Sequence, residues 1–264
     1  MALSRRDFVK LCSGTVAGFG VSQMFHPAIH EAFAQTLTGE RPPVFWVQGQ
    51  GCTGCSVTLL NSTHPSIADV LLKIISLEFH PTVMAAEGEG AYEHMMRVAE
   101  KFKGKFIFAV EGAVPVAHDG KCCVVAEADH HEVTMTEVTK VLAANAAAVL
   151  AVGTCAAYGG IPAGKGNETG AMGVSAFLKK EGIPAPVINI PGCPPHPDWI
   201  VGTIGLGLQA LATNTLGLLV KQGLDANGRP KAFYKNVHMN CPHLSAFEAG
   251  NMVKTMSYKD GCRF

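Results

Sequence analysis

The sequence has little charge, and neither sign is in excess. Lys and Arg together number 21, as do Asp and Glu, so the formal net charge is zero. This balance excludes the strongly basic footprint that is typical of nucleic-acid-binding proteins. Charged residues make up 16% of the chain, whereas ordinary soluble domains contain roughly 25%. We therefore expect a sizeable part of the surface to face another protein rather than water.

The sequence also lacks a long hydrophobic run. A membrane-spanning helix needs roughly 18 to 20 consecutive apolar residues. Gly, Ser, Thr, Gln and His interrupt every candidate stretch before it reaches that length. We therefore expect no transmembrane span in this chain, and we find no internal repeat and no low-complexity tract.

What the N-terminus does contain is the pattern of an export signal. The segment Ser4–Lys10 matches a twin-arginine motif, and a mildly apolar stretch follows over residues 11–24. Small residues then predict cleavage after Ala34, so residues 1–34 are expected to be a signal peptide and the protein to reach the periplasm. The alternative is an amphipathic helix with an accidental arginine pair. Because the twin-arginine route exports folded proteins, this signal favours a bound cofactor.

Short apolar segments alternate with helical patterns over residues 35–215. This β-α-β-α order favours an α/β fold with a parallel sheet, in which ligands bind beyond the carboxyl ends of the strands. Residues 216–264 lack the alternation, so we expect a second, small and irregular region that needs metals, disulfides or a partner to stay folded. The predicted strands are 44–48, 74–79, 106–110, 149–152 and 187–190, and the predicted helices are 52–60, 93–102, 135–146, 173–180 and 198–212.

Four cysteines follow the ends of three predicted strands. Cys52 and Cys55 form C-x-x-C after the first strand, and Cys155 and Cys193 each follow a later one. Because the carboxyl ends of parallel strands share one edge, the four thiols can converge there. Four thiolates are the ligand set of a 4Fe-4S cluster. Glycines that would allow close backbone approach to such a cluster surround them, at positions 51, 54, 153, 159, 160 and 192.

Two other uses of these cysteines stay open. Structural zinc usually takes its ligands from two short pairs, whereas Cys155 and Cys193 arrive singly from separate loops. Two disulfides are sterically conceivable in an exported chain, although export in folded form favours a preassembled centre.

Further polar residues and cysteines lie near these loops. His196 is expected to form hydrogen bonds beside the site rather than to be a ligand, and Asp198 to cap the helix that follows. Cys122 and Cys123, in an apolar strand-like run, are expected to be buried, unreactive thiols.

The cysteine loops resemble those of the small, electron-transfer subunit of periplasmic nickel-iron hydrogenases. The resemblance rests on Gly51–Ser56 (GCTGCS), Gly153–Gly160 (GTCAAYGG) and Pro191–Pro197 (PGCPPHP), and residues 80–84 and 130–135 are most similar to the nickel-iron-selenium group. The family has a flavodoxin-like domain with a proximal 4Fe-4S cluster. The resemblance implies that the ligands of this cluster are Cys52, Cys55, Cys155 and Cys193.

The resemblance also implies a partner and a direction for electrons. In the family, dihydrogen is split at a nickel-iron centre that lies in a separate large subunit, so no catalytic residue is expected in this chain. The small subunit passes electrons outward through iron-sulfur clusters to an acceptor, here expected to be a c-type cytochrome. Oxygen-tolerant relatives carry two extra cysteines where Gly54 and Gly160 stand, so their special six-cysteine cluster is not expected.

The second region carries part of another family pattern. His238, Cys241 and Cys262 match ligands of the family's distal 4Fe-4S cluster, although His238 alone would be read as a surface or packing residue. The sequence given ends at Phe264, before the family's fourth distal ligand and the cysteines of its medial cluster. The resemblance therefore implies a C-terminally truncated chain with an incomplete distal cluster and no medial ligands.

Two other functions are compatible with parts of this pattern. One is the cluster-bearing subunit of a related quinone-reducing complex, although the export signal and the H-x-x-C at His238–Cys241 speak against it. The other is a periplasmic binding protein stapled by disulfides, which would explain secretion and the even number of cysteines after residue 34.

Overall fold

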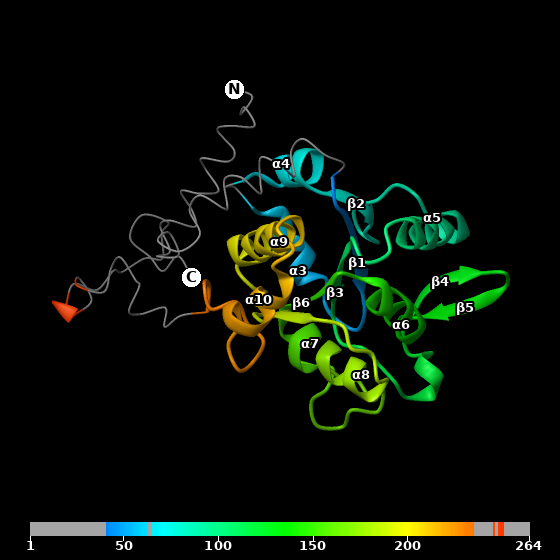
Figure 1. Cartoon of the computed structure of the whole chain (residues 1–264). Helices are drawn as coiled ribbons and strands as arrows, with labels where there is room; N and C mark the ends of the chain where they lie inside the picture. The colour runs from blue at the N-terminus through cyan, green and yellow to red at the C-terminus, as the bar shows by residue number, and fades with distance from the viewer. Residues whose placement is uncertain (1–40, 63–64, 235–244, 246–247, 251–264) are drawn as a thin grey trace.

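The computed structural model describes residues 41–62, 65–234, 245 and 248–250. At its centre is a five-stranded parallel sheet with the order β2-β1-β3-β6-β7 (Figure 1). In chain sequence this order is 2-1-3-4-5, which is that of flavodoxin-like sheets. The predicted parallel α/β fold is therefore confirmed. The strands are β1 (Pro43–Gln48), β2 (Ser76–Phe79), β3 (Ile107–Glu111), β6 (Ala148–Val152) and β7 (Val187–Ile190).

Helices cover both faces of the sheet (Figure 1). One face packs against α5 (Gly88–Lys101), α6 (Met135–Asn145) and α8 (Val174–Lys180), and the other against α3 (Gly54–Leu60) and α9 (Pro197–Ala212). Short helical segments complete the connections. They are α4 (Ile67–Asp69), η1 (Val70–Ile74), η2 (His118–Gly120), α7 (Gly153–Tyr158), α10 (Leu216–Leu218) and η3 (Leu219–Gly223).

Each central strand is apolar on both faces, because both faces are covered. In β1, Phe45 and Val47 belong to one core cluster, whereas Val44 and Trp46 belong to the other, as the two-residue period of a strand requires. Phe45 also meets Phe106 edge to face, with 4.9 Å between ring centroids. Fully burying one such side chain contributes about 1.5 to 3 kcal/mol, so the sheet is a rigid base for its loops.

Three predicted boundaries differ from the structure. The second strand begins at Ser76 rather than residue 74, because residues 70–74 form a π-helical turn. Helix α5 begins at Gly88, well before the predicted residue 93, since Gly88 and Gly90 weaken the helical signal of its first turn. The N-cap of α9 is His196 rather than Asp198: its ring accepts a hydrogen bond from the Asp198 backbone N–H at 3.3 Å.

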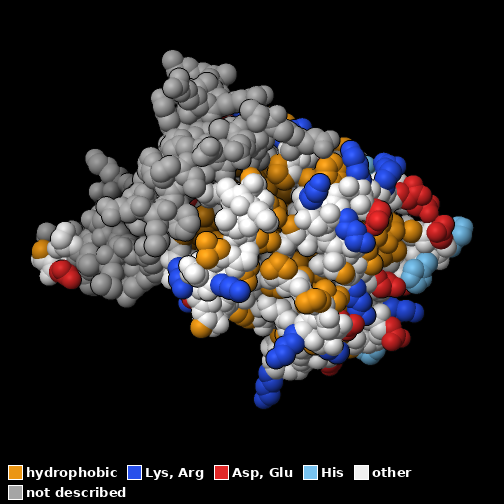
Figure 2. Space-filling view, viewed as in Figure 1, with side chains coloured by type: hydrophobic (Ala, Val, Ile, Leu, Met, Phe, Trp, Pro, Cys, Tyr) orange, Lys and Arg blue, Asp and Glu red, His pale blue; other side chains and the backbone are white. Residues whose placement is uncertain are grey.

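An antiparallel hairpin, β4 (Val124–Ala128) and β5 (His131–Thr134), extends from the sheet domain; the sequence indicated only the strand-like run at the start of β4, not the hairpin. Its two-residue turn, Asp129-His130, has positive φ at both residues, which usually calls for glycine or asparagine. Acidic and histidine side chains gather around this end of the molecule (Figure 2).

Cys122 and Cys123 lie just before β4 and are half-buried, so the prediction of buried thiols is too strong. Burial raises the pKa of the Cys123 thiol, which agrees with an unreactive side chain. Its Sγ lies 4.0 Å from the backbone oxygen of Gln48 at the end of β1. This pair therefore sits nearer to the carboxyl edge of the sheet than its sequence position suggested.

Residues 216–234 pack back onto the sheet domain. Leu224 is buried in the core beside α9, and a β-bridge joins it to Pro230. The predicted domain boundary at residue 215 remains a prediction. The predicted signal peptide and the residues His238, Cys241 and Cys262 lie outside the described residues. Within the part of the chain that the structure describes, no helix is long and apolar enough to cross a membrane.

Candidate metal centre

Four cysteines meet at the carboxyl edge of the sheet. Cys52 and Cys55 lie at the start of α3 after β1, Cys155 is in α7 after β6, and Cys193 follows β7. Electrostatic repulsion from Cys52, Cys155 and Cys193 contributes to raising the pKa of Cys55, so the four thiols lie within interaction range of one another. We call Cys52, Cys55, Cys155 and Cys193 the edge cysteines.

Two glycines provide the room around their sulfurs. Gly153, with φ of 87°, lies against Cys55, and a Cβ at residue 153 would overlap Cys55 Sγ. Gly160, with φ of 55°, lies against Cys155, and a Cβ there would be 2.7 Å from Cys155 Sγ. Any other residue would be strained by its backbone and would fill the space beside a thiol. The glycines therefore let the backbone pack directly against two of the sulfurs at this edge.

Hydrogen bonds join the loops that carry Cys155 and Cys193. The Thr154 backbone N–H donates to the Gly192 carbonyl at 2.9 Å, and the Thr154 hydroxyl donates to the same oxygen at 3.1 Å. In return the Gly192 N–H donates to the Thr154 hydroxyl oxygen at 3.1 Å. These bonds fix the spacing of two cysteines that are far apart in sequence.

The edge cysteines are free thiols with unequal surroundings. Cys52 and Cys193 are exposed, whereas Cys55 and Cys155 are partly buried. Burial is the largest cause that raises the pKa of Cys55, and also that of Cys155. Metal binding requires thiolates, and a bound metal offsets this cost because its positive charge favours the deprotonated form.

The donor set fits an iron-sulfur cluster better than one metal ion. Among the described residues, no three His, Cys, Asp or Glu side chains are grouped closely enough to hold a single ion. In a 4Fe-4S cluster each thiolate binds a different iron, so the four sulfurs are spread more widely than around a single zinc ion. The close approach of the backbone to the sulfurs at Gly153 and Gly160 is what such a cluster requires of its loops.

A buried carboxylate lies beneath the C-x-x-C loop, and the sequence analysis did not identify it. Glu111, at the last position of β3, is 3% exposed and accepts hydrogen bonds from the backbone N–H groups of Cys55 and Ser56 at 2.9 and 3.1 Å. The one signal in the sequence is an acidic residue that directly follows the apolar run 106–110. Such a residue must find donors or stay in water.

The loop of Cys193 is also tied to the chain that follows α9. The Tyr234 hydroxyl donates to the Pro191 carbonyl at 2.7 Å, and its ring lies 4.8 Å from that of Trp199. His196, as the N-cap of α9, has the hydrogen-bonding role expected of it. These contacts hold the chain leading to residue 235 against the site.

Exposed apolar side chains lie on the same elements as the edge cysteines. Val57 and Leu60 are on α3, with Val57 56% exposed, and Tyr158 ends α7. Ile161, just beyond α7, is 83% exposed. Large apolar side chains left exposed on neighbouring elements are often found at protein interfaces.

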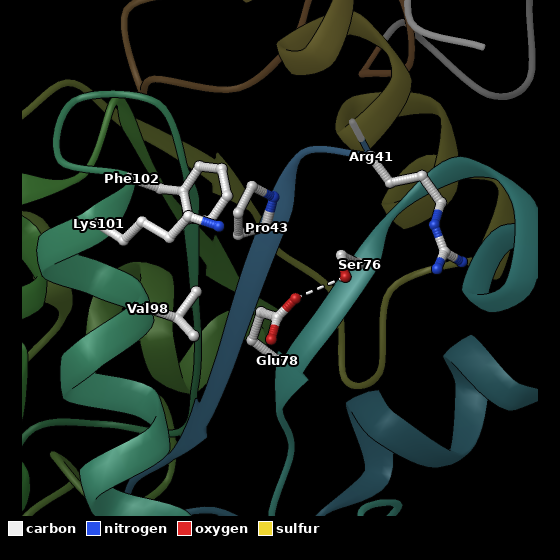
Figure 3. A pocket seen from close by; sticks show the side chains of 7 residues that line it. All are labelled: Arg41, Pro43, Ser76, Glu78, Val98, Lys101 and Phe102. Carbon is white, nitrogen blue, oxygen red and sulfur yellow. Dashed lines mark hydrogen bonds between the residues drawn. The ribbon is translucent and has the colours of Figure 1, made fainter. Parts of the chain in front are cut away.

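A separate cavity of about 420 Å³ lies at the opposite, amino edge of the sheet (Figure 3). Its polar groups are already engaged: Ser76 donates to Glu78, whose other carboxylate oxygen is 2.9 Å from His94 Nε2. It contains none of the edge cysteines. The residues that line it are Arg41, Pro43, Ser76, Glu78, Val98, Lys101 and Phe102.

Comparison with known sequences identifies relatives over the whole chain. Residues 52–206 match the family described as NADH ubiquinone oxidoreductase, 20 Kd subunit. The chain is 51% identical to the periplasmic [NiFeSe] hydrogenase small subunit of Desulfomicrobium baculatum, with 100% of this chain and 84% of that protein covered. It is 36% identical to the hydrogenase-2 small chain of Escherichia coli K12, with 96% of this chain and 63% of that protein covered.

Solved structures show the same similarity. A chain of the recombinant [NiFeSe] hydrogenase from Desulfovibrio vulgaris Hildenborough superposes with a TM-score of 0.76 at 65% identity, covering 87% of this chain and 82% of the other. A chain of the reduced, active Ni-Fe-Se hydrogenase from Desulfomicrobium baculatum gives a TM-score of 0.74 at 52% identity, covering 85% and 82%.

Proposed function

The chain belongs to the family of hydrogenase small subunits, the electron-transfer partners of a catalytic large subunit, and we propose that its edge cysteines hold a proximal 4Fe-4S cluster. The cluster would accept one electron at a time from the large subunit and pass it on. The observation that supports this most directly is the meeting of four free thiols at one edge of the sheet, where Gly153 and Gly160 let the backbone pack closely against two of the sulfurs.

The other functions considered for the sequence are not favoured. The matched family also includes a subunit of a quinone-reducing complex, but the relatives that align with nearly the whole chain are hydrogenase small subunits. A disulfide-stapled binding protein would pair its cysteines, whereas the edge cysteines are free. The similarity to the nickel-iron-selenium group is confirmed by both the sequence and the structure comparisons.

We propose that the large subunit, with its nickel-containing centre, covers the apolar surface around Val57, Leu60, Tyr158 and Ile161. Tyr158 supplies the kind of aromatic side chain that is enriched at interfaces. The low charge of the chain agrees with a large permanent contact.

We propose that electrons leave through the second region. His238, Cys241 and Cys262 are the candidate ligands of a distal 4Fe-4S cluster, and the contact of Tyr234 with Pro191 brings the chain before His238 close to the loop of Cys193. A histidine ligand generally raises a cluster's potential relative to thiolate, which suits an outlet to a c-type cytochrome.

The cellular location and the division of the chain are also proposals. Three relatives are named periplasmic hydrogenase subunits, and the segment Ser4–Lys10 supports export by the twin-arginine route. We propose a signal peptide over 1–34, a flavodoxin-like domain over 35–215 and an iron-sulfur region from 216 to 264. Replacing Arg5 and Arg6 by Lys should leave the enzyme in the cytoplasm, and normal periplasmic activity would contradict the export proposal.

The test of the cluster proposal is iron content in the complex purified with its large subunit. Cys193→Ala should lower iron by about four atoms per complex, because one thiolate of the proximal cluster is lost. Cys122→Ala is the matched control, since Cys122 is a partly buried cysteine outside the site, and it should leave iron unchanged. If Cys193→Ala retains all the iron and reduces dyes normally, the edge cysteines do not hold a cluster.

A further inference from the structure

We propose that Glu111 is a buried, ionised carboxylate that positions the C-x-x-C loop and lowers the reduction potential of the proximal cluster. The proposal rests on the function proposed above, because it concerns a cluster held by Cys55 and the other edge cysteines. It assigns to Glu111 a role in tuning the cluster that is separate from ligation.

The carboxylate of Glu111 is surrounded by donors. Its Oε1 accepts from the backbone N–H groups of Cys55 at 2.9 Å and Ser56 at 3.1 Å. Its Oε2 accepts from the indole N–H of Trp46 at 2.9 Å, from the Gln48 amide at 3.3 Å and from the Ser56 hydroxyl. An ionised carboxylate only accepts hydrogen bonds, so this set of partners suits the charged form.

The hydrogens in the surrounding network can be assigned without conflict. The Thr82 backbone N–H donates to His80 Nδ1 at 3.2 Å, so His80 carries its hydrogen on Nε2 and donates it to Ser56 Oγ, also at 3.2 Å. Gln48 Nε2 donates its two hydrogens to the same hydroxyl oxygen at 2.9 Å and to the Thr82 hydroxyl oxygen at 3.0 Å, and its longer contact with Glu111 at 3.3 Å shares one of them. This leaves the Ser56 hydrogen free to point at Glu111, so the main donors to the carboxylate are Trp46, Ser56 and the backbone N–H of Cys55.

No cation offsets the charge of Glu111 within the network. Burial lowers the pKa of His80, which favours the neutral ring, and the Trp46 and Gln48 groups are neutral dipoles. Among the residues that the structure describes, Glu111 forms no ion pair with Lys or Arg. The site thus holds one negative charge that is solvated by protein dipoles rather than by water.

The location of this charge connects it to electron uptake. The Glu111 carboxylate accepts a hydrogen bond from the backbone N–H of Cys55 itself at 2.9 Å, so its negative charge lies close enough to repel negative charge at the Cys55 sulfur. Adding an electron to a cluster bound by Cys55 adds negative charge at the same place and is disfavoured in the same way. Glu111 also engages two backbone N–H groups that would raise the potential if they bonded to cluster sulfurs.

The same contacts could in principle serve only to tie β3 to the loop. The Gln48 and Glu111 strand positions pair in register, and the Gly49 N–H donates to the Glu111 carbonyl at 2.7 Å, so the backbone already joins these strands. A purely mechanical tie would make every variant of the network loosen the loop. A charge effect would make two variants shift the potential in opposite directions.

The test uses the complex with its large subunit, in which the cluster is titrated electrochemically and followed by electron paramagnetic resonance. Glu111→Gln keeps the shape but removes the charge, and we expect iron to be retained and the potential to rise. The shift should change the ratio of reduced to oxidised cluster at a fixed potential at least tenfold, about 59 mV for one electron.

Trp46→Phe is the opposing variant. It keeps an aromatic ring against His80 but removes a donor from Glu111, so the carboxylate is less neutralised and the potential should fall by a smaller amount. Glu132→Gln removes an exposed carboxylate from β5 and should leave the potential unchanged. If the Glu111→Gln complex does not assemble its cluster, the sign of the potential shift in Trp46→Phe tests the proposal, because only a charge effect predicts a fall.

Each contrary outcome has a distinct meaning. Shifts of the same sign in Glu111→Gln and Trp46→Phe, or no shift in either, would overturn the role of the Glu111 charge. The signal followed must be the one that disappears in Cys193→Ala. If wild-type complex shows no such signal, the cluster assignment itself fails, and that result is independent of Glu111.

Discussion

The two edges of the parallel sheet differ in how exposed their charged side chains are and in how closely their backbone is packed. At the amino edge, the Arg41 guanidinium reaches the Leu72 carbonyl at 2.7 Å and the Lys101 ammonium lies 4.7 Å from the centre of the Phe102 ring, beside an open cavity (Figure 3). At the carboxyl edge the Glu111 carboxylate is buried and enclosed by donors, and glycines let the backbone pack against the sulfurs.

This difference in exposure indicates which charged side chains can affect the candidate metal centre. A charge in contact with water is screened, so its removal has little effect on its neighbours. An enclosed charge acts through a medium of lower dielectric constant and affects every group beside it. The same reasoning applies to space, because a methyl group added at the open edge meets solvent, whereas one added near the cysteines meets a sulfur.

The largest effect is expected from a substitution that introduces a steric clash at the carboxyl edge. Gly153→Ala would place a methyl group on Cys55 Sγ at a backbone with φ of 87°, so we expect loss of the proximal cluster, measured as about four irons fewer per complex. Gly182→Ala is the matched control, because it has φ of 69° but nothing within 4 Å of the added carbon. It should cost about 1 to 2 kcal/mol of folding free energy and no iron. Equal iron loss in both variants would refute the steric explanation.

The next effect separates the two loops that Thr154 joins. Thr154→Val keeps the side-chain shape but leaves the Gly192 N–H without the hydroxyl oxygen, so we expect about 1 to 3 kcal/mol of destabilisation. Iron release under a chelator should be faster than in wild type. Thr213→Val, which removes a hydroxyl bond to Gln209 at the end of α9, should leave the release rate unchanged. Identical rates in all three proteins would argue against a coupling between the loops.

A third effect concerns pH and follows from His80. Burial lowers the pKa of His80 in the folded protein, whereas in the unfolded chain this pKa has its ordinary value of about 6.5. Below about pH 6.5 the unfolded chain therefore binds a proton at His80 more readily than the folded protein does. Stability is therefore full above that value and declines as the pH falls below it, by at most about 1.4 kcal/mol per pH unit. Melting temperatures between pH 7 and pH 5 should show this slope in wild type and a shallower one in His80→Asn. Parallel slopes would assign the pH dependence to other groups.

The smallest effect tests the amino edge. Glu78→Gln weakens a pair with His94 that is partly open to water, so we expect at most about 1 kcal/mol of destabilisation. Iron content and the potential of the cluster should match wild type, in contrast to Glu111→Gln. A change in potential as large as that of Glu111→Gln would show that distance from the cysteines does not govern the effect.

The strands and their parallel arrangement could be predicted from the sequence because both faces of the sheet are buried. Runs such as Val149–Val152 are apolar throughout, and each is followed by a loop with glycine or cysteine, which marks the carboxyl end. The positions of the four edge cysteines followed from this pattern alone. The resemblance to hydrogenase small subunits then rested on those loops, and the relatives confirm it.

Other features depend on contacts that no local pattern records. Glu111 acquires its role from donors on β1 and α3, which are far from it in sequence. The hairpin was missed because its Asp129-His130 turn lacks the glycine or asparagine that usually marks such a turn. The cap of α9 was assigned to Asp198 because aspartate is the commoner N-cap, whereas the fixed φ of Pro197 makes it the first helical residue and leaves the cap to His196.

The unequal exposure of the edge cysteines has a consequence for the order of assembly. Cys52 and Cys193 face outward, while Cys55 and Cys155 lie deeper against the sheet. A group that binds all four sulfurs must therefore reach the inner pair past the outer pair. A partner that covers Cys52 and Cys193 blocks this access, so the metal must bind before the partner docks. Once formed, the interface shields the bound metal from solvent.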